Sequence, residues 1–132
     1  MIGGRVLDAT AVHAIVTGSS EYAQALLTVA TDLGIPLAVP ATALQAAWQE
    51  ADPKARPWLD LLPEAATVVV LDLTAQVARD AGLLAADSGH PGAPASAGHA
   101  VAVALERSWP VVTRHPDVLL ALSPDVRTET IP

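Results

Sequence analysis

The feature that most constrains the fold is the alternation of short apolar segments with longer amphipathic ones. Apolar runs typical of buried strands fall at residues 5–8, 36–39, 67–71 and 110–113, and a weaker run at 126–131 predicts an edge strand. Apolar residues recur at helical spacing over residues 20–33, 41–51, 74–86 and 96–108. Strands separated by helices pair in parallel, and a parallel sheet is covered on both faces. The sequence therefore predicts an α/β fold, a three-layer α/β/α sandwich with a central, mostly parallel sheet.

Local signals place the ends of several segments. Ser19 or Ser20 is suited to cap the helix at 20–33, and Gly34 to end it. The prolines within residues 52–63 predict a short helix between turns, and the Gly- and Pro-rich residues 87–95 predict an exposed, mobile loop. No internal repeat is present, so residues 1–132 form one domain in this interpretation.

Composition excludes several classes of protein. The chain contains no cysteine, which rules out a disulfide framework, a thiolate metal site and a cysteine nucleophile. The longest uncharged stretch, residues 33–49, is interrupted by prolines and is shorter than a membrane span, so no membrane partner is expected. No basic region followed by an apolar one opens the chain, and this predicts a cytoplasmic protein.

The charge balance disfavours binding to a nucleic-acid backbone. Seven basic residues against fourteen acidic ones give a net charge of −7, whereas phosphate binding needs clustered Lys and Arg. A local patch would require Arg5, Arg107 and Arg114 to gather near one end of the sheet. RNA therefore stays an open partner.

The residues with chemical potential fall at strand ends. Asp8 closes the first strand just before Thr10 starts a helix, and Thr113 and His115 follow the strand at 110–113. Carboxyl ends of parallel strands share one edge, where open α/β sheets form their ligand crevice. We expect these four side chains to meet there.

Two helices are expected to reach the same crevice. The helix that starts after Pro40 leaves this edge, so Gln45 and Ala46, about 8–9 Å along it, can still face the crevice. Ser96 and Ala97 lie in the first turn of the late helix. Four separated segments would thus line one cavity.

Four motifs in this order resemble the PIN-domain family, most closely the VapC-type toxins of bacterial toxin–antitoxin pairs, and the likeness covers essentially the whole chain. They are Val6-Leu7-Asp8-Ala9-Thr10, Val39-Pro40-Ala41-Thr42-Ala43-Leu44, Gly98-His99-Ala100-Val101-Ala102-Val103-Ala104 and Val111-Val112-Thr113-Arg114-His115-Pro116-Asp117. The resemblance implies a ribonuclease that holds Mg²⁺ or Mn²⁺ with three or four carboxylates, since hard divalent ions prefer oxygen ligands and activate water.

This chain departs from the acidic pattern that the resemblance implies. The first acid is Asp8, with Thr10 as its hydroxyl neighbour, but the second position falls on Gln45 or Ala46, the third on Ala97 or Ser96, and the fourth on His115. Asp8 would be the only remaining metal ligand, in a vestigial site. Other carboxylates that could help it are Glu50, Asp87 and above all Asp117, two residues beyond the fourth position.

Other kinds of site are less well matched. His13, His90, His99 and His115 follow no zinc spacing, although His115 with Asp8 remains a candidate pair, and His99 is expected to be a partly buried, hydrogen-bonded residue. A phospho-acceptor domain would need paired acids after the first strand and a late lysine, so Asp72 is interpreted as a helix cap near Thr74. Ser96 is interpreted as a cap because no nucleophile elbow surrounds it.

Together these features favour a PIN-like protein that no longer cleaves RNA and needs no cofactor. Its expected role is binding, through a homodimer and an antitoxin-like partner; the alternative is a weak or atypical Mg²⁺- or Mn²⁺-dependent ribonuclease. Residues counted as hydrophobic make up 52% of the chain, so some apolar surface is expected outside the core. The candidate surfaces are the stripe Tyr22, Leu26, Val29 and Leu33 and the cluster Trp58, Leu59 and Leu62.

Overall fold

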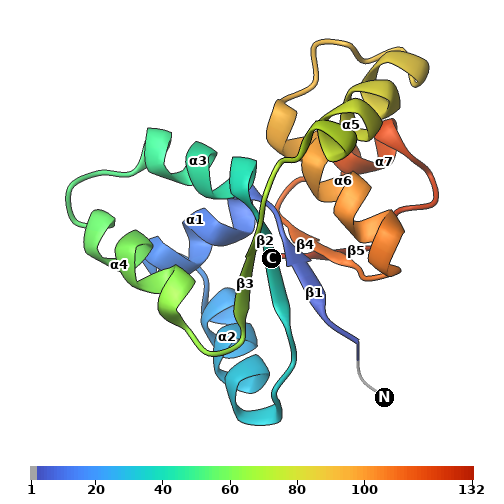
Figure 1. Ribbon diagram of the computed structural model, residues 1–132. Helices are drawn as coiled ribbons and strands as arrows, with labels where there is room; N and C mark the ends of the chain where they lie inside the picture. The colour runs from blue at the N-terminus through green and yellow to red at the C-terminus, as the bar shows by residue number, and fades with distance from the viewer. Residues whose placement is uncertain (1–2) are drawn as a thin grey trace.

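The computed structural model describes residues 3–132, in which a five-stranded sheet carries helices on both faces (Figure 1). The strand order is β3-β2-β1-β4-β5, and every neighbouring pair is parallel. The strands are β1 (Arg5–Leu7), β2 (Leu37–Pro40), β3 (Val68–Leu71), β4 (Val111–Thr113) and β5 (Thr128–Thr130). The three-layer α/β/α prediction is confirmed, including the edge strand near the carboxyl end of the chain.

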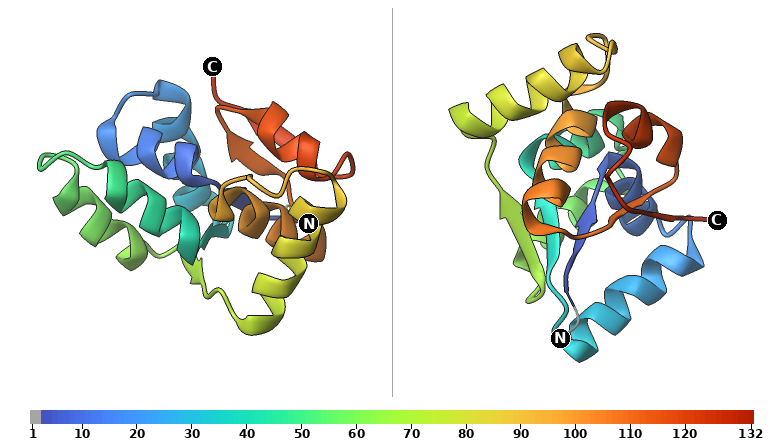
Figure 2. Two further views of the ribbon diagram at one scale, coloured as in Figure 1. Left: turned by 90° about the horizontal axis from the view of Figure 1, so that it is seen from above. Right: turned by 90° about the vertical axis from the view of Figure 1, so that its right-hand side faces the viewer.

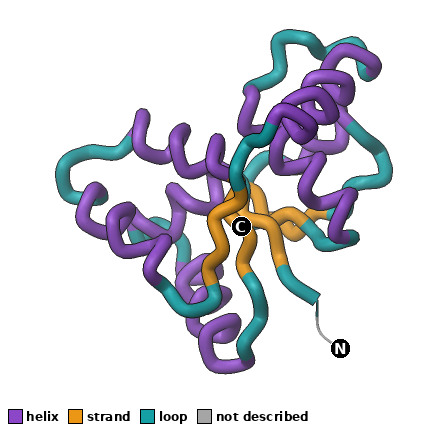
Figure 3. The backbone as a smooth tube through the Cα atoms, in the orientation of Figure 1, coloured by secondary structure: helices purple, strands orange, loops and turns teal. Residues whose placement is uncertain are grey.

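The helices divide into two groups, one on each side of the sheet (Figures 1 and 3; Figure 2, left). One layer contains α1 (Ala9–Thr17), α2 (Glu21–Leu33), α3 (Ala41–Glu50), α4 (Arg56–Leu61) and the short 3₁₀ helix η1 (Leu62–Glu64). The other contains α5 (Ala75–Asp87), α6 (Ala95–Arg107) and α7 (Pro116–Leu122). No helix within residues 3–132 has the length and apolar character needed to cross a membrane.

The central strand β1 contributes a side chain to each of the two hydrophobic cores. Leu7 belongs to the core under α1–α4, whereas Val6 belongs to the core under α6 and α7. Both side chains are fully buried, as expected where successive residues of a strand point to opposite faces of a covered sheet.

Several predicted helix ends are confirmed. The Ser20 hydroxyl caps α2 by accepting a hydrogen bond from the Ala23 amide at 3.1 Å. Gly34 ends the same helix in the left-handed conformation, with φ of 67°, which glycine adopts without steric cost. The proline-rich segment folds, as expected, into the short helix α4 followed by η1.

Other predicted helix ends were wrong. Thr74, not Asp72, caps α5, because its hydroxyl accepts from the Val77 amide at 3.2 Å. Helix α6 already begins at Ala95, so Ser96 lies inside the first turn and makes no cap. Asp87 is the last residue of α5 rather than part of a loop.

The structure contains one helix that was not predicted, and it separates three arginines that a basic patch would have required to lie together. Helix α7 was not expected. Arg5 begins β1, whereas Arg114 follows the carboxyl end of β4, so these two arginines lie at opposite edges of the parallel sheet. Arg107 instead lies over the Trp109 ring, 5.3 Å from its centroid. These three arginines therefore do not gather into the local basic patch that nucleic-acid binding would require.

The strand order fixes where a ligand crevice would form. The chain passes from β1 outward to β2 and β3, then returns to β4 on the other side of β1 and continues to β5. The order thus reverses between β1 and β4, and open α/β sheets bind ligands outside the carboxyl ends of the strands at such a switch point.

Candidate functional site

The site at the switch point is built around Asp8 and Thr113. Leu7 of β1 pairs with Val112 of β4, so the residue that follows each comes level at the carboxyl edge of the sheet. Asp8 is 7% exposed and Thr113 is fully buried. The predicted meeting of these strand ends is therefore present.

Asp8 has a structural task at this position. Its Oδ1 accepts hydrogen bonds from the Ala11 amide at 3.0 Å and from the Thr10 hydroxyl at 2.6 Å, so it caps the amino end of α1. Backbone N–H groups in the first turn of a helix lack partners within the helix, and a carboxylate is among the best caps for them. The cap of α1 therefore gives Asp8 a structural role that needs no metal.

The Thr10 hydroxyl joins this cap to the end of β4. It donates to Asp8 and accepts from the Arg114 amide at 2.9 Å, and it lies 3.5 Å from the Thr113 hydroxyl. Thr113 in turn accepts from the His115 amide at 2.9 Å. A continuous polar network therefore lies at the switch point and satisfies backbone groups in the first turn of α1 and in the segment after β4.

Helices α3 and α6 carry the other positions that were expected to face this network. Helix α3 packs against both α1 and α6. On α3, Gln45 is exposed and Ala46 is half-buried; on α6, Ser96 is half-buried and Ala97 is 7% exposed. Ala46 lies one turn after Thr42, which faces α6, so of the two α3 positions it is Ala46 that shares the inward face.

The remaining predicted residues are more open to solvent. His115 precedes α7 as its N-cap residue without a side-chain cap bond, and Asp117 lies in the first turn of α7. Both are exposed, as is Glu50 at the end of α3. Asp87 lines a groove on α5 that contains none of the other site residues.

The donor set does not fit a resident Mg²⁺ or Mn²⁺ ion. Within residues 3–132, no group of three or more His, Asp or Glu side chains is arranged to hold a metal ion. Asp8 is the only buried residue among the fourteen acids of the chain. A single carboxylate that already caps a helix leaves a hard cation without the oxygen ligands it needs.

One polar pair, between α3 and α6, was not predicted from the sequence. His99 of α6 is fully buried, and its Nδ1 lies 2.8 Å from the Thr42 hydroxyl of α3. A partly buried, hydrogen-bonded side chain was predicted, whereas His99 is fully buried, and its partner, 57 residues away in the chain, was not predicted. The spacing of four residues between His99 and the apolar Val103 is the signal that places His99 on a buried face of α6.

Burial lowers the pKa of His99 below its ordinary value of 6.5, because the charged imidazolium loses hydration; the backbone of Asp72 opposes this shift. Its Nε2 is buried and makes no hydrogen bond of normal geometry in the described chain. Burial therefore favours the neutral form of the His99 side chain, and its contact with Thr42 joins α3 to α6.

Comparison with known proteins identifies the fold. No protein-family model and no curated protein matches this sequence. The chain is similar to one in the crystal structure of VapBC2 from Rickettsia felis bound to a DNA fragment from their promoter, with a TM-score of 0.69 over 97% of this chain and 98% of that chain. The chain has a VapC-like PIN fold. Sequence identity is 15%, so the likeness carries the fold and not the residues of a site.

Unfolding experiments can distinguish Asp8 as a helix cap from Asp8 as a metal ligand. Asp8→Ala removes the acceptor for the Ala11 amide and the Thr10 hydroxyl, and we expect the free energy of unfolding to fall by about 1 kcal/mol. Asp8→Asn retains a good cap and should stay close to the wild type. Urea unfolding of the three proteins measures the difference. An Asp8→Ala protein more stable than the wild type would instead mark Asp8 as a strained ligand.

The lowered pKa of His99 predicts a pH dependence of stability. Below pH 6.5 the unfolded chain takes up a proton at this residue while the folded chain does not, so stability falls as the pH drops toward the folded-state pKa. Between about pH 7.5 and about pH 5.5, His99→Gln should lose less free energy of unfolding than the wild type. The exposed His90 provides the control, since His90→Gln should keep the wild-type slope. Equal slopes for all three proteins would contradict the assignment.

Proposed function

We propose that the chain is a PIN-fold protein that has lost the nuclease centre of VapC-type toxins and acts as a binding module. The observation that carries this proposal is the isolation of Asp8. It is the only buried acid, and the inward positions on α3 and α6 that would support it are Ala46 and Ala97.

The energetics of a carboxylate cluster support the same reading. Two carboxylates about 4 Å apart repel by roughly 4 kcal/mol at an effective dielectric constant near 20, and a bound ion normally offsets this cost. Alanines at two of the supporting positions remove the repulsion. The carboxyl ends of β1 and β4 then need no ion to be stable, because the network of Asp8, Thr10 and Thr113 links them.

One observation favours the alternative of a weak or atypical Mg²⁺- or Mn²⁺-dependent ribonuclease. Both hydrogen bonds to Asp8 end on Oδ1, so Oδ2 remains available for a cation at the switch point. Asp117, which begins α7 beside the same edge of the sheet, is the acid closest in sequence to the fourth family position. Such a site would hold its ion mainly through water and substrate.

The surface offers apolar area for a partner. On α2, Tyr22 is 39%, Val29 47% and Leu33 63% exposed, and on α4 Trp58 is 60% and Leu61 58% exposed. Leu59 and Leu62, which were expected at this surface, are core residues instead. A cavity of about 230 Å³ between α1, α2 and α4 is bordered by Trp58 and Leu61. Large exposed apolar residues of this kind are typical of protein-protein contacts.

We assign these surfaces to a homodimer and to an antitoxin-like protein. The similar chain comes from a VapBC2 complex, which is the reason to consider an antitoxin-like partner here. The two faces lie next to each other, because α2 and α4 both pack around α1. RNA is a weaker candidate, because the chain carries a net charge of −7 and its arginines do not form one patch.

The loss of the metal centre is tested by thermal melting with added ions. About 5 mM Mn²⁺ or Mg²⁺ should leave the melting temperature unchanged, whereas an ion at a hundred times its dissociation constant would add about 2.7 kcal/mol. Single-stranded RNA should stay intact. The variant Ala46→Glu, Ala97→Asp and His115→Asp should gain stabilisation by Mn²⁺, and adding Asp8→Asn to it should abolish that gain.

Two results would contradict the loss of the centre. One is stabilisation of the wild type by several degrees that disappears in Asp8→Ala. The other is RNA cleavage by the wild type that disappears in Asp8→Asn, a protein that keeps the helix cap and so separates chemistry from folding.

Self-association is tested by light scattering behind a sizing column. At about 10 μM, above the dissociation constant of a micromolar dimer, the mass should be twice the 13.5 kDa of one chain. Charges on the exposed apolar faces should dissociate it, so Val29→Glu with Leu33→Glu is compared with Trp58→Glu and Leu61→Glu. A monomer mass for the wild type would reject the homodimer.

A further inference from the structure

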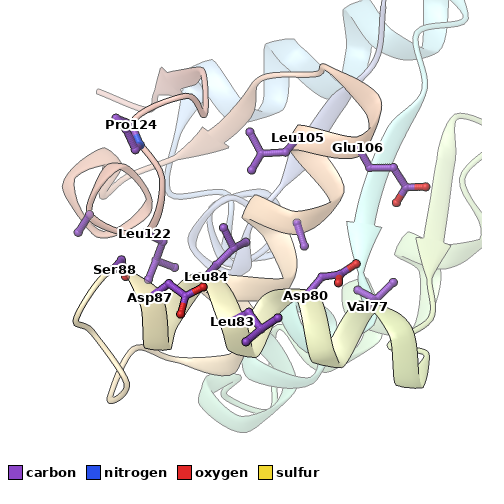
Figure 4. Close-up of a pocket in the computed structure, with 12 residues that line it drawn as sticks. Val77, Asp80, Leu83, Leu84, Asp87, Ser88, Leu105, Glu106, Leu122 and Pro124 are labelled. Carbon is purple, nitrogen blue, oxygen red and sulfur yellow. The ribbon is translucent and has the colours of Figure 1, made fainter.

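A groove of about 840 Å³ runs between α5, α6 and α7, in the helical layer that contains neither Asp8 nor the α2 and α4 surfaces. Its middle is apolar. Figure 4 shows Leu83 and Leu84 on α5 and Leu105 on α6, and Leu122 of α7 lines one side of the groove. Leu83 is 41% and Leu105 37% exposed, so this apolar area is in contact with solvent.

The border of the groove is acidic. Asp80 and Glu106 lie toward one end and Asp87 toward the other (Figure 4). All three are exposed, and no lysine or arginine lines the groove. Arg79 contacts Asp80 at 3.4 Å, but both side chains are at least half-exposed, so this pair offsets little of the negative charge. Asp87 and Glu106 form no ion pair within residues 3–132.

We propose that this groove docks a basic amphipathic helix of a partner protein. An amphipathic helix binds in such a groove with its apolar face inward, using residues at positions i, i+3, i+4 and i+7. The acids on both sides then require Lys or Arg along the flanks of the same helix. This proposal is independent of whether Asp8 supports catalysis, because none of the residues in the groove belongs to that site.

The spacing of the acids restricts the partner further. Asp80 and Asp87 are seven residues apart on α5, which is two turns or about 10.5 Å. A partner helix that runs along α5 would meet both with basic residues about seven positions apart. The 13 residues of α5 span about 20 Å, so a helix of about 13 to 15 residues covers the groove.

The same charge argument excludes two other occupants. A second copy of this chain has no helix that carries two basic residues, since α4, α5 and α6 contain one arginine each and the other described helices contain none. An RNA backbone would be repelled by the three acids. A cationic helix is the occupant that satisfies both the apolar floor and the acidic border.

The test uses a fluorescent helical peptide of about 15 residues with leucines at i, i+3, i+4 and i+7 and lysines seven apart on the flanks. A twin peptide carries glutamate in place of lysine. Fluorescence anisotropy should show binding of the lysine peptide, weaker at high salt because surface charges are screened, and no binding of the glutamate twin. Asp87→Lys with Glu106→Lys should weaken binding by about tenfold or more.

Matched variants separate the groove from the net charge. Asp32→Lys with Glu64→Lys makes the same change in charge at exposed positions outside the groove and should leave binding unchanged. Leu105→Ala, which shortens an exposed side chain, should weaken binding while the melting curve stays close to that of the wild type.

Three outcomes would overturn the proposal. The first is equal binding of the two peptides, or binding of neither. The second is an equal loss of peptide binding in the groove variant and in the control variant, which would mean that binding depends only on the net charge of the protein. The third is a doubled mass that disappears in Asp87→Lys with Glu106→Lys, which would assign the groove to a second copy of this chain.

Discussion

The burial of β1 is the constraint on which the rest of the structure depends. This three-residue strand has parallel neighbours on both edges and helices on both faces, so each of its groups must be satisfied by the protein. The Arg5 and Val6 amides donate to Pro36 and Pro110, and the Asp8 amide reaches Val112. Because Val6 and Leu7 pack into the cores on opposite faces of the sheet, both layers of helices contact this strand. Asp8, the next residue, is still buried, but its side chain lies at the carboxyl end of the strand, where it caps α1.

That carboxylate can serve the backbone or a metal ion, and the surroundings decide between them. In a cluster of acids, ionised oxygens close together would be costly without a cation. Here the resemblance assigns two of the supporting positions to Ala46 and Ala97, and Oδ1 of Asp8 accepts hydrogen bonds from an amide and a hydroxyl. Thr10 extends this arrangement to the segment after β4, so the polar network joins the first turn of α1 to that segment. Asp8 thus has a structural role that does not depend on a metal ion.

Local signals made much of the fold predictable, whereas contacts between distant segments were not. The caps at Ser20 and Gly34 and the strands rest on neighbouring residues, and their placement was correct to within a residue or two. Helix α7 was not predicted because its seven residues are too few to show a helical period in the sequence. It also follows His115, which has an irregular backbone conformation. Asp72 and Thr74 are both good caps, and only the backbone path decides that the hydroxyl accepts the bond.

The candidate site divides in the same way. Strand order predicts that Asp8 and Thr113 meet, since carboxyl ends of parallel strands share an edge. The pair of Thr42 and His99 depends on how α3 crosses α6, and no spacing along the chain encodes that crossing. The same limit applies to the acidic groove, whose border comes from two helices whose relative orientation is a result of packing.

The distribution of charge connects the proposed surfaces. Thirteen of the fourteen acids lie outside the core, so the net charge of −7 acts almost entirely at the surface, where fields extend about 8 Å at physiological salt. Two copies of the chain therefore repel one another at a distance and can associate only where a face is apolar, as on α2 and α4. A cationic partner is attracted instead, and its encounter rate rises through steering. The acids around the α5–α7 groove are best placed to capture it, because the apolar floor beneath them adds contact area that charge alone does not supply.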